Sequence, residues 1–93
     1  MKTIMEGRIE DDLLWLQELS QKHPRLSDRI TRVVAKINGI KPTVNMPVTP
    51  QRQREEIKIH QELCIIGVVL ISVHDPQNER IARIMGDIMA PIF

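Results

Sequence analysis

The stretch PQRQREEIKIHQELCIIGVVLISVH, residues 50–74, decides which kind of fold this chain can adopt. It follows Thr49, which can cap a helix, and it begins with Pro50, a residue favoured at the first helical position. Apolar residues then recur at intervals of 4, 3, 4 and 3, and this seam consists of Ile59, Leu63, Ile66, Leu70 and Val73. The pattern predicts one long helix over residues 50–74.

The other sides of this helix are also apolar, because Ile57, Cys64, Ile65, Val68, Val69 and Ile71 lie between the seam positions. A helix that is apolar all round is expected at the centre of a fold, covered by its neighbours. The alternative is a buried strand at 64–73, since six of these ten residues are β-branched. We favour the helix and expect an all-α fold.

Helical periodicity predicts three shorter helices, at about 8–22, 24–38 and 76–89. Asn38-Gly39 is expected to stop the second of these with a left-handed residue, and Asp75-Pro76 is expected to start the last. The segment 39–49 has prolines and no helical period, which predicts an extended, polyproline-like connection.

The chain has 93 residues, of which 42% are hydrophobic and 27% charged. A chain of this size buries roughly 60 to 65% of its unfolded surface, enough for a single core. We therefore expect one small four-helix domain over residues 1–93.

The lengths of the helices predict self-association. The 50–74 helix would be about 37 Å long and the others nearer 20 Å, so part of the seam is expected to stay uncovered in a single chain. A homodimer or higher homo-oligomer would cover it. The alternative is that the three short helices are staggered and cover the long one. The candidate self-association residues are Ile59, Leu63, Ile66, Leu70 and Val73.

Cysteine content and hydropathy bear on the compartment. Cys64 is the only cysteine, so an intrachain disulfide is excluded and a reducing compartment is favoured. The first residues contain no apolar run of signal-peptide length. The longest apolar stretch, 63–73, is about half the ~20 residues that a membrane helix needs. We expect a cytoplasmic protein without a membrane partner.

The sequence contains no arrangement of residues typical of an enzyme or a metal site. His60 and Cys64 are four residues apart, but two ligands do not make a metal site. Ser72 lies too close in sequence to His74 and Asp75 for a catalytic triad on one regular element. We expect Cys64 to lie in the core. We therefore predict no catalytic residue, no metal and no cofactor.

Charge is segregated between the first two helices. Residues 1–21 carry two cations and five anions, whereas residues 22–41 carry six cations and one anion. The basic stripe on the second helix consists of Arg25, Arg29, Arg32 and Lys36. It could bind nucleic-acid phosphates or a protein partner; alternatively, it faces the acidic first helix or is solvated.

Taken together, these features predict a small non-enzymatic helical protein that binds and modulates a larger protein partner. The alternative is a nucleic-acid-associated regulator that uses the basic stripe. A small enzyme whose site forms only at an oligomer interface is a third hypothesis. Ile92 and Phe93 at the carboxyl end are candidate docking residues for a partner.

Overall fold

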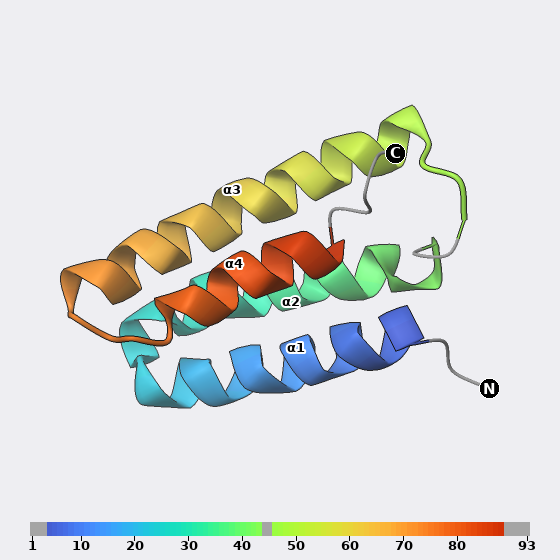
Figure 1. Cartoon of the computed structure of the whole chain (residues 1–93). Coiled ribbons are helices and arrows are strands. Elements are labelled where there is room, and N and C mark those ends of the chain that lie inside the picture. The colour runs from blue at the N-terminus through green and yellow to red at the C-terminus, as the bar shows by residue number, and fades with distance from the viewer. Residues whose placement is uncertain (1–3, 44–45, 89–93) are drawn as a thin grey trace.

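The structure, a computed structural model, describes residues 4–43 and 46–88 and arranges them in four helices (Figure 1). Successive helices run in opposite directions. The helices are α1 (Ile4–Lys22), α2 (Ser27–Ile40), α3 (Pro50–Ser72) and α4 (Asn78–Ile88), with short 3-10 helices at Pro24–Leu26 and Lys41–Thr43. The all-α four-helix prediction is confirmed. Residues 64–72 are helical, so the strand alternative is wrong.

The second helix differs most from its predicted bounds of 24–38. Pro24–Leu26 forms a 3-10 turn, and α2 then continues to Ile40. Gly39 lies inside the helix without a positive φ, so the predicted stop at Asn38-Gly39 is wrong. The physical reason is that Ile40 is buried, and one further turn of helix carries its side chain into the core.

The start of α3 agrees with the sequence pattern, because the backbone N–H of Arg52 donates a hydrogen bond to Thr49 Oγ1 at 3.1 Å. The helix ends at Ser72, two residues before the predicted end, and His74 adopts a left-handed φ of 57° in the turn that follows.

α4 begins at Asn78 rather than at Pro76. Asp75 Oδ1 accepts a hydrogen bond from the backbone N–H of Gln77 at 2.9 Å, which makes residues 75–77 a turn before the helix. The predicted last residue of this helix, Met89, lies outside the described residues.

One core holds the four helices together. α2 and α4 each pack against α3, and α1 packs against α2 and α4 on the opposite side from α3. In the seam of α3, Ile59, Leu63, Ile66 and Leu70 are completely buried. Gly67 brings α4 close, because a Cβ at this position would lie 3.5 Å from Ile81 Cγ2. The prediction that this helix is covered all round is wrong, because Ile57, Val68 and Ile71 on its outer side are exposed.

Arg52 fixes the connection that leads into α3. Its guanidinium donates hydrogen bonds to the carbonyl oxygens of Thr43 and Met46 and to Glu56 Oε1, the last at 3.0 Å. The side chains of Arg52 and Glu56 are only 5% and 7% exposed. Lys41–Thr43 is a 3-10 turn, so the predicted extended connection over 39–49 is wrong for its first part, and residues 44–45 lie outside the described residues.

Replacing Arg52 by Met should lower the free energy of unfolding by about 2–4 kcal/mol, because Glu56 would keep a buried charge without its cation. Urea unfolding followed by the fluorescence of Trp15 measures this loss. Arg54→Met, at an exposed position on the same helix, is the control and should change stability by less than about 0.5 kcal/mol. Equal losses for the two variants would contradict the role given to Arg52.

Candidate functional site

The side of α3 turned away from the core is apolar and exposed. The exposed fractions are 53% for Ile57, 41% for Ile65, 64% for Val68 and 58% for Ile71, and Cys64 is exposed between them. Four of these residues fall within about 60° of arc at 100° per residue. We define the outer face of α3 as Ile57, Cys64, Ile65, Val68 and Ile71.

A groove runs between this outer face and α4. It has a volume of about 310 Å³ and is lined by apolar groups of Val68 and Ile71 on one side and of Ala82 and Met85 on the other. Residues 63–73 include no charged side chain. The outer face and the groove together form a continuous uncharged surface over the second half of α3.

Most of the predicted self-association residues are not accessible to a second chain. Ile59, Leu63, Ile66 and Leu70 are buried within the single chain, so the part of the seam that was expected to stay uncovered does not include these four residues. The reason is that α2 and α4 both pack on this side of α3. The alternative, in which three short helices cover the long one, is not found either, because α1 packs against α2 and α4 and the outer side of α3 stays exposed. Val73 is 53% exposed and lies just beyond the end of α3.

The basic stripe of the second helix is divided in the structure. Arg25 lies in the 3-10 turn and, like Arg32, is exposed. Arg29 Nη1 lies 3.4 Å from Glu62 Oε2 of α3, and Lys36 is half-buried. The acidic and basic segments are also in contact, because Lys41 Nζ, in the 3-10 turn after α2, lies 2.9 Å from Glu10 Oε1 of α1.

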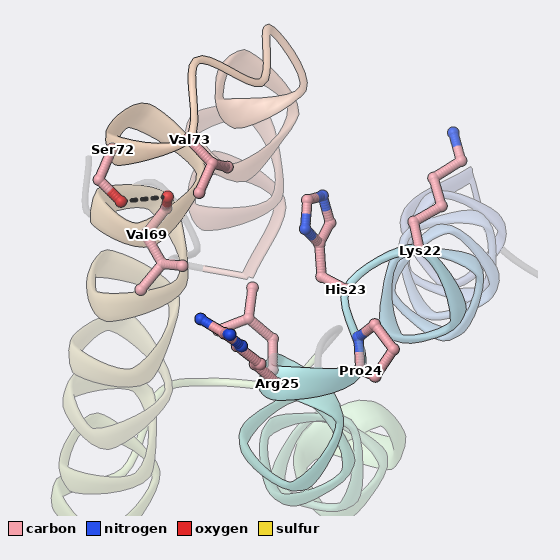
Figure 2. A pocket seen from close by; sticks show the side chains of 8 residues that line it. Lys22, His23, Pro24, Arg25, Val69, Ser72 and Val73 are labelled. Carbon is pink, nitrogen blue, oxygen red and sulfur yellow. Dashed lines mark hydrogen bonds between the residues drawn. The ribbon is translucent and has the colours of Figure 1, made fainter.

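A second hollow, of about 440 Å³, lies at the end of the bundle where α1 meets α2 and α3 ends (Figure 2). His23 projects into it, and its Nε2 lies 2.8 Å from Asp75 Oδ2. The hydrogen bond from the backbone N–H of Gln77, together with His23, lowers the pKa of Asp75. Lys22 and His23 stand at the carboxyl end of α1, where helix carbonyl groups attract cations. The contact between His23 and Asp75 therefore connects the turn between α1 and α2 to the turn between α3 and α4.

His60 and Cys64 are the residues that come closest to a metal pair, with Nδ1 of His60 3.6 Å from Sγ of Cys64. Cys64 is exposed, so its predicted place in the core is wrong. Within residues 4–43 and 46–88, no three His, Cys, Asp or Glu side chains are placed to hold a metal ion. The hydroxyl group of Ser72 donates a hydrogen bond to Val69 O, and Asp75 Oδ2 is hydrogen-bonded to His23.

Asp12 is a buried carboxyl group that the sequence reasoning missed. It is 1% exposed on α1, and its Oδ1 accepts a hydrogen bond from Arg80 Nη2 at 3.0 Å. Burial, and next the hydrogen bond and negative charge of Asp87, raise the pKa of Asp12 to about 7. The sequence signal is its position at helical spacing within the buried row formed by Ile9, Leu16 and Leu19.

The surroundings of Asp12 favour its protonated form. Asp12 Oδ2 is buried and has no donor directed at it. A protonated carboxyl group can donate a hydrogen bond to Asp87, and this contact is one of the causes of the raised pKa of Asp12. The guanidinium of Arg80 also lies over the Trp15 ring, 5.8 Å from its centroid, so the same cation joins a carboxyl group and an aromatic ring.

The tail residues Ile92 and Phe93 lie outside the described residues. Among the helices that the structure describes, none combines the length and the apolar character needed to cross a membrane. No protein-family model matches the chain, and no curated protein or solved structure is significantly similar to it. Its function is therefore inferred from its own surface.

Asp12 should make stability depend on pH. Its pKa is about 7 in the folded chain and 3.8 ordinarily, so between these values the folded chain keeps a proton that the unfolded chain has lost. The free energy of unfolding should therefore fall as the pH rises from about 4.5 to 8, by on the order of 3 kcal/mol. Asp75 titrates below this range, because its pKa is lowered.

Urea unfolding of Asp12→Asn over the same pH range should lack most of this fall, because the amide stays neutral. Asp11→Asn, at the exposed neighbouring position, should retain it. If Asp12→Asn and the unmodified chain lose stability equally with rising pH, the buried proton is not held by Asp12.

Proposed function

We propose that this chain is a small non-enzymatic helical interaction protein that binds and modulates a larger protein partner. The outer face of α3 and the groove beside α4 form the binding surface. The observation that carries this proposal is the concentration of exposed aliphatic side chains on that face: Ile57, Ile65, Val68 and Ile71 are each at least 41% exposed. A cytoplasmic location belongs to the same proposal, because an exposed free thiol at Cys64 suits a reducing compartment.

The completeness of the core supports an external role for this face. On the inner side of α3, four residues are fully buried against α2 and α4, and the helices that the structure describes do not use the outer face for their own packing. The four are Ile59, Leu63, Ile66 and Leu70. The other exposed apolar residues of the described part are scattered: Ile4 and Leu14 lie on α1, Met46 and Val48 in the connection before α3, and Val73 just after α3. Contiguous apolar patches of this kind mark interaction sites, whereas single exposed residues are ordinary.

The polar clusters also support a non-enzymatic role. His23 and Asp75 bond each other across two turns, and Arg80 bonds the buried Asp12 between α1 and α4. Each of these pairs joins elements of the fold, and the groove beside the outer face is lined almost entirely by carbon atoms. Such a surface suits recognition of an apolar partner segment better than bond-making chemistry.

The nucleic-acid alternative has weaker support from the geometry. It requires the four cations of the basic stripe to act together, but Arg29 is already close to Glu62 and Lys36 is half-buried. Arg25 and Arg32 remain exposed, which leaves two phosphate contacts and a correspondingly weak, salt-sensitive attraction.

The proposal is tested by isolating the tagged chain from its native cells and comparing what remains bound to three forms. Val68→Asp should lose the partner that the unmodified chain retains, because a charge in the apolar face would be buried unpaired on binding. Leu14→Asp is the matched control, since Leu14 is 59% exposed on another helix. Thermal unfolding of all three forms should show that the fold is kept.

A partner that is lost with Val68→Asp and retained with Leu14→Asp supports the proposal. If the same proteins remain bound to all three forms in equal amounts, the outer face is not the binding surface.

The alternative function has its own measurement. We expect the unmodified chain to give no shift of a labelled DNA or RNA probe at 50 mM salt. A shift that disappears at higher salt, and that is abolished by Arg25→Glu with Arg32→Glu, would favour the nucleic-acid function. Arg54→Glu on α3 controls for the change in overall charge.

A further inference from the structure

We propose that the outer face of α3 binds a second copy of this chain, with the two α3 helices antiparallel and a two-fold axis beside Val68. This inference goes beyond the proposed function, because it assigns a second occupant, another copy of the chain, to the same face. It is carried by two independent features of the described residues: the pattern of apolar residues around Val68, and the placement of two opposite charges on α4.

The apolar pattern is symmetrical about Val68. Ile65 and Ile71 lie three residues on either side of it, and Cys64 and Ser72 lie four residues on either side. Positions three and four residues away surround a central side chain on a helix surface and form a hole that can receive a side chain from another helix. Val68 is the most exposed aliphatic residue of the outer face, at 64%.

A two-fold axis beside Val68 therefore makes this surface complementary to itself. Val68 of one copy meets Val68 of the other, and Ile65 of each copy lies opposite Ile71 of the other. Both surfaces are uncharged over residues 63–73, so their contact buries no unpaired charge. A closed symmetric pair is the commonest arrangement for a self-complementary patch.

The charges on α4 match the same axis and select the antiparallel arrangement. Gly67 and Ile81 lie at one level, because a Cβ on Gly67 would be 3.5 Å from Ile81 Cγ2. The helices run in opposite directions, so Glu79 lies near the level of Val69 and Arg83 near that of Ile65. Both side chains are exposed.

Rotation about an axis beside Val68 inverts the direction of α4. Glu79 of each copy then lies within about 3 Å, along the helix direction, of the level of Arg83 of the other copy, and both α4 helices lie on the same side of the α3 pair. Opposite charges at the rim favour this alignment, whereas a shift of α3 by one or two turns would lose both the apolar match and the charge match.

Light scattering tests whether the pair forms. The unmodified chain should have twice the mass of one chain at micromolar concentration, Val68→Asp should have the mass of one chain, and Leu14→Asp should keep the doubled mass. A single-chain mass for the unmodified protein overturns the inference, whether the face is then covered by the tail 89–93 of the same chain or by a different protein. Retention of the doubled mass by Val68→Asp overturns it as well.

Charge exchange on α4 tests the alignment. At low salt, Glu79→Arg and Arg83→Glu should each weaken the dimer about 3- to 30-fold, because each creates like charges at the rim on both sides of the axis. The double variant Glu79→Arg/Arg83→Glu should restore the original dissociation constant. Additive weakening in the double variant overturns the antiparallel alignment.

These results separate the two proposals. A single-chain mass together with loss of a larger partner in Val68→Asp would overturn the inference and leave the proposed function standing. A doubled mass that Val68→Asp abolishes, with no change in larger partners, would support the inference and contradict the proposed function.

Discussion

The burial of one side of α3 against α2 and α4 is the interaction on which the rest of the structure depends. Ile59, Leu63, Ile66 and Leu70 are fully buried there, and α2 and α4 in turn hold α1 on the far side of the bundle. Among the described residues, each of the four helices has two close neighbours, and none of the other three covers the outside of α3 (Figure 1). The exposed apolar face is thus the result of a long helix that is apolar on two sides and that its neighbouring helices cover on one side.

The polar contacts within the core region fix how the helices are connected. Arg52 holds the chain that enters α3, and the pair of His23 and Asp75 holds the turn that leaves it against the junction of α1 and α2. Arg80 joins α4 to α1 through Asp12. Each pair links elements that hydrophobic packing alone would allow to slide, so these contacts favour one register of the bundle.

Much of the fold could be predicted from local patterns. Thr49 and Pro50 mark the start of α3 because capping depends on a few adjacent residues, and the buried rows of α2 and α4 follow from their helical period. Gly39 shows the limit of such reasoning, because the buried Ile40 that follows it keeps the chain helical where glycine alone predicts a stop.

The candidate site could be predicted only in part, for a physical reason. Ile57, Cys64, Val68 and Ile71 have spacings of 7, 4 and 3, which are as regular as those of the inner seam, so periodicity cannot say which side faces the core. That choice depends on which neighbours pack where, and this is a property of the whole chain. The burial of Asp12 depends likewise on α4 lying beside α1.

The single open face of α3 also limits how many neighbours the protein can have at one time. A second copy and a larger partner would occupy the same side chains, above all Val68 and Ile71, so the two would compete. Under our proposals, the concentration of the chain itself would then set how much of it is free to engage the partner. At a low concentration of the chain, the complex with the larger partner would be favoured. At a high concentration, more of the chain would form homodimers and a smaller fraction would be free to bind the partner.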